Sequence, residues 1–575
     1  VYMDGVFGIS SADISTGDYL VTEVRSERTL LDEIYKFSPS EIICNEAFYM
    51  SGIDLEELKN RLHAVVTALE NRFFSDDSCR KLLREHFHVN HLDGLGISQY
   101  EAGTIAAGAV LQYLCETQKS TLEHLTGITP YTTGQYMMLD TSTRRNLELT
   151  ETLREKQKRG TLLWVLDKTR TAMGARLLRA WIEQPLIRKE EILKRQNAIE
   201  ELNLNYISRE ELGEYLNPVY DLERLIGRIS YKTANPRDLL AFRNSIAMVP
   251  HIKQLLGEFT SDALKELTEE LDPLEDLNDL ISRAIVEEPP ITVREGGMIK
   301  DGYNEEADRL RHAKTEGKTW LAELEARERD STGIKNLKVK YNKVFGYYFE
   351  VTNSFKDLVP DYFIRKQTLT NAERYITQEL KDLEDLILGA EDRLYALEYE
   401  LFADVRDKVG KEVVRIQKTA KAIAALDVFA SLALVAERNN FVRPKINENG
   451  VLDIKNGRHP VVEQMIENDM FIANDTYLDN QKKRVSIINY LCGLADGAWI
   501  CRDAFRTFRW RCISPYFCSL SDLDDWFCQE SKSSTQGKSD DARRGRISRR
   551  RNSDPATLEM CVIYCWRHDR NQVWR

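Results

Sequence analysis

The strongest candidate for chemistry is a lysine-rich stretch near the middle of the chain. Residues Gly333 to Phe349 (GIKNLKVKYNKVFGYYF) contain four lysines and no acidic residue, in a chain whose net charge is −12. Lysine ammonium groups on flexible stems bind the phosphates of a nucleic-acid backbone without reading the bases. Lysines also suit the solvent face of a strand, where they discourage pairing with other edges. The stretch therefore predicts either a phosphate-binding surface or an ordinary solvated strand.

A histidine cluster near the N-terminus is the first candidate for metal binding. His86, His88 and His91 lie close together, and the interposed Phe87 and Val89 have the alternation of a strand. Alternation would place His86 and His88 on one face, but histidines on a strand are more often structural than metal-binding. We expect no metal ion here.

The last part of the chain contains two weak motifs. Cys561, Cys565 and His568 offer three zinc ligands, one fewer than structural zinc normally uses. A phosphate loop of the form GxxxxGK[ST] does not occur anywhere in the sequence, and the Gly-Lys-Ser of residues 537–539 lacks the upstream glycine. We therefore assign no metal site, no catalytic base and no nucleophile.

The lysine-rich stretch is expected to lie at the tip of a long helical arm. Apolar residues and lysines alternate from Leu337 to Tyr341, and Gly346 allows a turn into a second strand, Tyr347 to Val351. Helical patterns flank this hairpin from Tyr303 to Asp330 and from Ala372 to Val409. At 1.5 Å per residue they would form rods of roughly 40 and 55 Å, which favours a coiled-coil arm.

The region before the arm reads as a small α/β unit followed by a helical body. Val6 to Val24 has the alternation of a β-hairpin, Glu41 to Cys44 reads as a buried strand, and Asp54 to Leu69 reads as a helix. Apolar residues at helical spacing then continue from Tyr100 to Tyr303. The helices predicted within this body are Ala102 to Glu116, Thr161 to Glu183, Lys189 to Leu204 and Arg237 to Leu256.

After the arm, a last helix, Lys421 to Arg438, leads to a change of pattern near Phe441. Val451 to Ile454 and Arg484 to Ile488 read as strands and predict the beginning of a further α/β domain. The most apolar stretch of the chain, Ala422 to Ala436, is shorter than a membrane span and contains an aspartate, so we predict no transmembrane helix and no membrane partner.

The composition of the chain indicates how many domains to expect and which ligands its surface can bind. At roughly 150 residues per domain, 575 residues predict about four domains, and 42% apolar with 30% charged residues is ordinary for a folded protein. The acidic net charge excludes nucleic-acid binding by the whole surface and leaves only a local basic patch. Three dispersed cysteines, Cys44, Cys79 and Cys115, suit a reducing cytoplasm.

The final residues have another composition. Asn489 to Arg575 hold seven of the ten cysteines, five of the eight tryptophans, and 13 arginines against two lysines. With 15 basic and 11 acidic residues this tail has a charge of +4, which leaves −16 for the rest of the chain. We expect residues 490–575 to be an aberrant tail, translated out of frame from near Asn489. The chain opens on Val1 without a methionine, which we read as a cut or incomplete gene.

Several long blocks carry a resemblance to a known family. They include LDKTRTAMGARLLRAWIEQPL (Leu166 to Leu186), REGGMIKDGYN (Arg294 to Asn304), TGIKNLKVKYNKVFGYYFEVT (Thr332 to Thr352), TLTNAERYI (Thr368 to Ile376) and GRHPVVEQ (Gly457 to Gln464). In type and order the chain resembles the MutS family of DNA mismatch-repair proteins from Val1 to about Asn489.

The resemblance implies a multidomain α+β architecture. It implies a small α/β connector domain at 1–117, an all-α lever core at 118–302 and 376–440, a coiled-coil arm with a β-hairpin clamp at 303–375, and the beginning of an ABC-type α/β ATPase domain at 441–489. It also implies double-stranded DNA as ligand, a homodimer, ATP and Mg²⁺ as cofactors, a cytoplasmic location, and downstream repair partners such as MutL.

The resemblance also assigns roles to single residues. Phe471 matches the position that stacks on the adenine ring, and His459 lies in a turn beside the same site, where a structural hydrogen bond is an equally good role for it. The residues expected to contact the DNA backbone are Lys335, Lys338, Lys340, Asn342 and Lys343, with Arg365 and Lys366 as weaker candidates.

Two features of the family pattern are missing from the sequence. The mismatch-reading domain with its Phe-x-Glu wedge should precede the connector, and a phosphate loop should follow Ile487 to Asn489. The first hypothesis is therefore a mismatch-repair protein that clamps DNA and is coupled to ATP, lacking both parts here. The alternatives are a catalytically inactive DNA clamp or scaffold, and a structural coiled-coil protein with no role on DNA.

Overall fold

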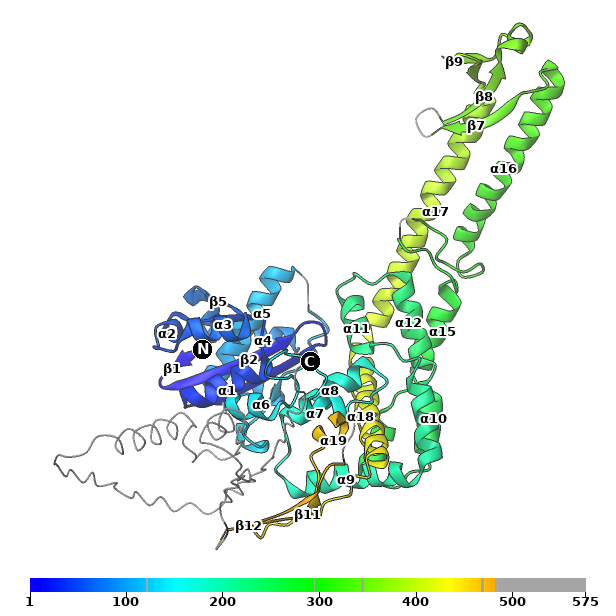
Figure 1. The fold of residues 1–575 in the computed structure, drawn as a ribbon. Coiled ribbons are helices and arrows are strands. Elements are labelled where there is room, and N and C mark those ends of the chain that lie inside the picture. The colour runs from blue at the N-terminus through cyan, green and yellow to red at the C-terminus, as the bar shows by residue number, and fades with distance from the viewer. Residues whose placement is uncertain (120–121, 294, 343–345, 467–469, 481–482, 484–575) are drawn as a thin grey trace, which may run out of the picture.

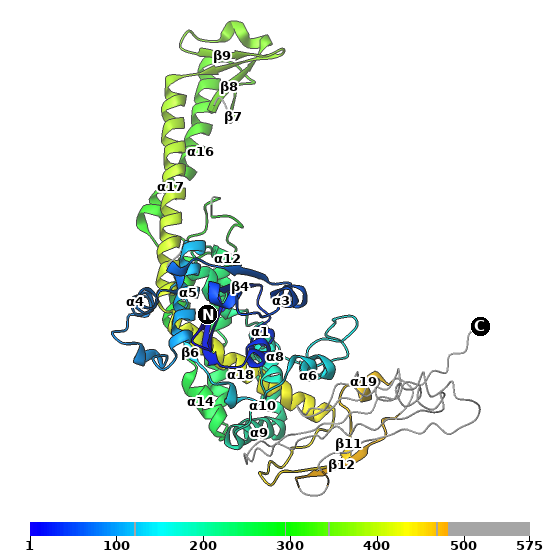
Figure 2. The same cartoon turned by 90° about the vertical axis from the view of Figure 1, so that its left-hand side faces the viewer.

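The computed structural model describes residues 1–119, 122–293, 295–342, 346–466, 470–480 and 483. Several predictions lie outside these residues: Lys343, the strand at 484–488, the Gly-Lys-Ser of 537–539, the three zinc-ligand candidates and the whole tail. The described part is elongated (Figures 1 and 2). A helical body occupies the centre, an N-terminal α/β unit lies at its side, and a long arm extends from one end.

The N-terminal unit contains the predicted hairpin. Its main sheet has the order β1-β2-β3-β6, with β2 and β3 antiparallel and β6 parallel to β3. A separate parallel pair, β4 and β5, completes the sheet structure. The buried helix α5 (Glu101–Gln118) packs on β2. The strands are β1 (Tyr2–Met3), β2 (Val6–Asp13), β3 (Asp18–Val24), β4 (Glu41–Cys44), β5 (Val65–Ala68) and β6 (Thr129–Pro130).

Two predictions in this unit are wrong. The helix expected over Asp54 to Leu69 is only α3 (Leu55–Leu62), because the β-branched residues that follow pair with β4 as strand β5. His86 ends α4 (Asp76–His86) and does not lie on a strand. Cys79 and Leu83, four residues apart, are buried on one face of α4, so helical periodicity outweighs the short alternation around His86.

The body consists of packed helices around one large apolar core. The predicted helix Lys189 to Leu204 has the same bounds in the structure as α9. Two longer predictions are split, one by the loop between α7 and α8 and the other by a turn before Pro250, which suits the first turn of a new helix. The other helices of the body include α6 (Thr141–Leu147), α7 (Leu162–Leu166), α8 (Ala172–Glu183), α10 (Tyr206–Leu216), α11 (Leu222–Ser230), α12 (Pro236–Ile246), α13 (Val249–Leu256), α14 (Asp262–Glu270) and α15 (Glu275–Ala284).

Helix α18 (Val413–Arg438) runs through the centre of this body and contacts α8, α9, α10, α11 and α14. By length and apolar composition alone it could cross a membrane, but 67% of its most apolar window is buried inside the protein. Its apolar residues are therefore used for packing against the surrounding helices. Asp427, in the middle of this stretch, is also buried.

The arm consists of two long helices that run side by side and a small sheet near their free end (Figure 1). We call this sheet the arm sheet; its four strands have the order β7-β8-β10-β9. In both views β9 lies nearer the free end and β7 nearer the body. The elements are α16 (Glu305–Thr332), β7 (Lys338–Asn342), β8 (Gly346–Thr352), β9 (Ile364–Thr368), β10 (Ala372–Ile376) and α17 (Gln378–Lys411).

The returning helix of the arm begins later than predicted. Residues Ala372–Ile376 form β10, which pairs with β8 and β9, and α17 begins only at Gln378. The Thr377 side chain accepts a hydrogen bond from the Leu380 amide and caps the helix. The predicted hairpin is thus half of a four-stranded sheet.

The described chain ends in a small ribbon at the end of the body opposite the arm (Figure 2). Strand β11 (Val451–Gly457) contains the predicted strand Val451 to Ile454 and pairs antiparallel with β12 (Asn474–Asp479). Between them lies the short helix α19 (Val462–Met465).

Candidate nucleic-acid interface

The lysine-rich strands are held in place by carboxylates from the two arm helices. Glu325 on α16 accepts a hydrogen bond from the Val339 amide of β7 at 2.8 Å. Glu384 on α17 accepts one from the Tyr347 amide of β8 at 3.2 Å. Apolar residues of β7, β8 and β10 pack with both helices in one core cluster beneath the sheet. Each arm helix therefore fixes one strand of the hairpin, and the opposite face of the sheet is left for polar side chains.

Lys338 and Lys340 lie on the exposed edge strand β7, as predicted. The acid-free stretch ends at Phe349, however, and the next residue, Glu350, lies on β8 beside the lysines of β7. Glu350 lies directly across from Lys338, and its carboxylate is 2.7 Å from the Lys340 ammonium group. This contact raises the pKa of Lys340. One of the two strand lysines therefore has part of its charge compensated within the sheet.

The other residues predicted on the hairpin differ in placement. Lys335 is exposed just before β7, and Asn342 is half-buried at its end, opposite Gly346. Gly346 has the positive φ of +74° expected for a turn, and the Glu384 carboxylate lies where a β-carbon would be. Lys343 falls outside the described residues.

The outer face of the arm sheet carries a cation that the sequence reading did not single out. Arg374 on β10 lies across from Glu350, and its guanidinium stacks 4.4 Å from the centre of the Tyr348 ring. Its Nη1 donates to the Gln367 side chain at 2.7 Å. A helix was predicted to begin at Ala372, so residues 372–376 were taken as part of that helix and not as the strand β10 that carries Arg374.

Arg365 and Lys366 lie on the opposite edge strand, β9, with exposed side chains. Arg365 approaches the buried carboxylate of Glu373 at 3.5 Å, and Lys356 approaches the same carboxylate at 2.9 Å. The Tyr375 hydroxyl also donates to Glu373, which together with Lys356 lowers the pKa of that carboxyl. Burial and the adjacent carboxylate raise the pKa of Tyr375 to about 12. Sequence reasoning missed both Lys356 and Glu373.

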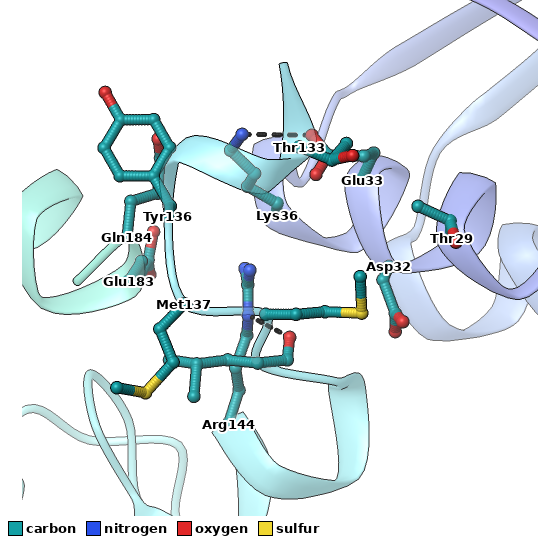
Figure 3. Close-up of a pocket in the computed structure, with 12 residues that line it drawn as sticks. Thr29, Asp32, Glu33, Lys36, Thr133, Tyr136, Met137, Arg144, Glu183 and Gln184 are labelled. Carbon is teal, nitrogen blue, oxygen red and sulfur yellow. Dashed lines mark hydrogen bonds and ion pairs between the residues drawn. The ribbon is translucent and has the colours of Figure 1, made fainter. Parts of the chain in front are cut away.

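Away from the arm, a small cleft lies between the N-terminal unit and the body (Figure 3). Lys36 forms an ion pair with Glu33 at 3.0 Å, and its ammonium group lies 4.2 Å from the centre of the Tyr131 ring. Burial lowers the pKa of Lys36 and that of Arg144, whose Nε donates to the Leu139 carbonyl at 3.0 Å. The cleft is lined by charges of both signs in contact with one another, as in a packed joint.

None of the described residues forms a group of three or more His, Cys, Asp or Glu side chains that could hold a metal ion. His86 instead bonds through Nε2 to the Leu125 carbonyl at 3.0 Å. His88 lies beyond the end of α4, so the three histidines do not share one strand face.

Comparison with known proteins identifies the family. Residues 142–433, about half of the chain, match the profile of MutS domain III, and residues 2–126 match that of MutS domain II. The chain belongs to the MutS family. The arm and most of the body thus lie within MutS domain III, and most of the N-terminal unit lies within MutS domain II.

Individual relatives agree with this assignment. The DNA mismatch repair protein MutS of Lachnoclostridium phytofermentans is 64% identical over 488 residues, which is 85% of this chain and 52% of that protein. The proteins of the same name from Ruminiclostridium cellulolyticum and Acetivibrio thermocellus are 49% and 48% identical, over 85% and 84% of this chain and 56% and 55% of their own length. The chain spans about half the length of the curated MutS relatives it matches.

The two residues that the MutS resemblance assigns to nucleotide binding lie near the C-terminal ribbon. Phe471 is half-buried just before β12. His459 accepts hydrogen bonds through Nδ1 from the Val461 and Val462 amides, both at 3.2 Å, as a cap for α19. These two hydrogen bonds hold the turn that precedes α19.

The described residues do not by themselves fit ATP and Mg²⁺. They offer a half-buried aromatic ring for a base at Phe471, but the ribbon of β11 and β12 brings no glycine-rich turn at the start of a helix to that ring. We therefore derive no step through a nucleotide.

Proposed function

We propose that this chain is the DNA-clamping part of a mismatch-repair protein, in which the arm sheet contacts the phosphates of double-stranded DNA. The observation that carries the proposal is the placement of Lys335, Lys338 and Lys340. All three are exposed on or beside an edge strand near the end of a 28-residue and a 34-residue helix, far from the acidic body. Lysines in such a position bind backbone and leave sequence preference unchanged.

The family membership supports this choice over a purely structural helical protein. The matched relatives carry the name DNA mismatch repair protein MutS. For the longer family protein we propose the remaining functions: a homodimer, an ATPase domain that begins at about residue 441 and switches the clamp with ATP and Mg²⁺, and downstream partners such as MutL. We also propose a cytoplasmic location, because the three cysteines in the described residues are free thiols.

The test is a double charge reversal on β7. Lys338→Glu with Lys340→Glu in the full chain should weaken binding to a short DNA duplex and reduce the slope of log affinity against log salt by about 1 to 2, because Lys338 loses a full phosphate contact and Lys340 is already partly compensated by Glu350. Sequence preference should not change. Fluorescence anisotropy at several salt concentrations measures all three quantities.

A matched control carries the same change of charge on the body. Lys265 and Lys418 are exposed on α14 and α18, away from the arm. Lys265→Glu with Lys418→Glu should leave the salt slope unchanged. If both double variants weaken binding equally, the arm sheet is not the interface and net charge alone governs the affinity.

The second candidate function is a DNA clamp or scaffold without ATPase activity. The lack of a GxxxxGK[ST] motif in the sequence favours it for this chain. We propose that the chain alone binds duplex DNA and hydrolyses no ATP. A phosphate-release assay with mismatched duplex decides: DNA-stimulated hydrolysis by the purified chain would contradict the assignment.

A further inference from the structure

A buried carboxylate lies beneath two exposed cations on the arm sheet. The Glu373 side chain is only 3% exposed, whereas those of Lys356 and Arg365 are 51% and 58% exposed. Both cations approach the same carboxylate oxygen, Oε1, at 2.9 and 3.5 Å, and the Tyr375 hydroxyl donates to the other oxygen. One buried negative charge thus holds two positive charges side by side at the surface.

The three charged residues come from separate segments. Lys356 lies in the turn after β8, Arg365 lies on β9, and Glu373 lies on β10 between β8 and β9. The register places Glu373 across from Val351, on the same side as the apolar core of the sheet. The carboxylate is therefore anchored from within the fold, while both cations extend from the edge of the sheet into solvent.

A contribution to the stability of the fold does not explain why two cations share the carboxylate of Glu373. An exposed ion pair stabilises a protein by at most about 1 kcal/mol, and a buried carboxylate loses hydration that its partners must replace. One cation and the tyrosine would be enough to pair Glu373. The second cation leaves a net positive charge, and the ammonium and guanidinium groups keep further N–H donors directed away from the single oxygen they share.

We propose that Glu373 is a positioning residue that holds Lys356 and Arg365 together as a second phosphate-binding site on the arm sheet, at the β9 edge. The inference rests on the proposed function, because it assigns a further contact to the same DNA-binding arm. A phosphate oxygen is its ligand, since two converging cations suit a shared anionic oxygen.

The location makes this site separate from the lysines of β7. The two edges of a four-stranded sheet are three strand spacings apart, or about 14 Å. A cation at each edge would therefore contact a different phosphate, and substitutions at the two edges should have additive effects on the binding free energy. Lys366 lies exposed beside Arg365 on β9 and adds to the charge of this edge.

Lys356 and Arg365 need to be held in position because the charges around them are of both signs. Asp357 and Asp361 are exposed in the segment that joins β8 to β9. These two carboxylates offset part of the long-range attraction of DNA by Lys356 and Arg365. The two cations then contribute mainly through direct contact, which requires that their side chains be held in position.

Glu373→Gln in the full chain shows whether Glu373 positions Lys356 and Arg365 or only neutralises their charge. If Glu373 only neutralises its neighbours, removing its charge makes the edge more positive and strengthens duplex binding. If it positions them, each released side chain must be ordered again on DNA, and binding weakens by roughly two- to tenfold. Anisotropy with a short duplex at fixed salt gives the sign. Unchanged or tighter binding overturns the inference.

Two surface substitutions test the same site without risk to folding. Lys356→Gln and Arg365→Gln should each reduce the salt slope by about 1, and Lys265→Gln on α14 is the control that should not. If these variants match the control while the double β7 variant weakens binding, the β9 site is refuted and the proposed function stands. If the unchanged chain does not bind duplex DNA, both fail.

Discussion

At the scale of single residues, Asp427 shows how one side chain organises a distant loop. It is 1% exposed in the middle of α18, and burial raises the pKa of its carboxyl. Its oxygens accept hydrogen bonds from the Arg170 amide at 2.8 Å and from the Thr171 amide and hydroxyl at 2.7 Å. A β-carbon at Gly174 would lie 2.3 Å from Oδ2, so only glycine permits this approach.

We therefore expect Asp427→Asn to destabilise the body by about 1–3 kcal/mol, because the new amide group would face a buried backbone donor. Urea denaturation followed by circular dichroism measures the loss, and faster hydrogen exchange over residues 168–174 would locate it. Asp392→Asn, on the exposed face of α17, is the control. Equal transitions for the two variants would show that the carboxylate is dispensable.

At the scale of elements, the arm is fastened to the body by the loop that precedes α16. Glu398 on α17 is fully buried and accepts hydrogen bonds from Arg311 of α16 at 2.9 Å and from the Gly297 amide. Gly296 has a φ of +66°, and a β-carbon there would lie 2.3 Å from the Tyr395 ring. This loop, the two arm helices and their charges therefore form one joint at the base of the arm.

Glu398→Ala should loosen this joint. Arg311 would lose a buried partner but keep Asp301 and Asp308, and the Gly297 amide would lose its acceptor, at a cost of about 1–3 kcal/mol. Hydrogen exchange should become faster over residues 295–311 and stay unchanged in the arm sheet. Glu400→Ala, exposed two residues further along α17, should change neither region. Protection that is equal in both variants would contradict the role of the joint.

At the scale of the whole molecule, the N-terminal unit is attached to the body through the tip of its first hairpin and through the segment that follows α5. Gln417 of α18 donates to the His124 carbonyl at 2.8 Å and accepts from the Thr126 hydroxyl at 2.8 Å. Gly17, at the tip, approaches so closely that a β-carbon would lie 2.6 Å from the Gln417 amide nitrogen. Because α18 follows α17 directly, one helical path links the arm, this joint and the C-terminal ribbon.

Gln417→Leu should weaken this attachment by about 1–3 kcal/mol, since a buried carbonyl and a hydroxyl lose their partner. We expect faster hydrogen exchange at residues 13–18 and 122–126 and no change in α10. Lys418→Ala, next in sequence and exposed, serves as the matched variant. If exchange at the hairpin tip is the same in both, the side-chain bonds of Gln417 do not hold the two parts together.

Prediction from sequence was accurate for several elements with a continuous pattern, although two long helical predictions, Thr161 to Glu183 and Arg237 to Leu256, are each split by a loop or a turn. The hairpin of β2 and β3, the helix α9 and the paired helices of the arm were all predicted from periodicity. Predictions failed where two patterns overlap in a few residues. Residues 54–69 and 372–376 contain apolar residues compatible with either helix or strand, and pairing with β4 in one case and with β8 and β9 in the other decides for strand.

The amino-acid sequence was enough to predict an α/β unit, a helical body and a long arm that carries a basic hairpin. Periodicity and composition reveal such elements because each element depends on residues that are close together in the chain. Tertiary structure alone decided which charges remain available. Glu350 reaches Lys340 across the sheet, and Glu373 gathers Lys356 and Arg365 from separate segments. Such contacts depend on strand order and register, so the binding surface follows from the fold and not from the basic stretch alone.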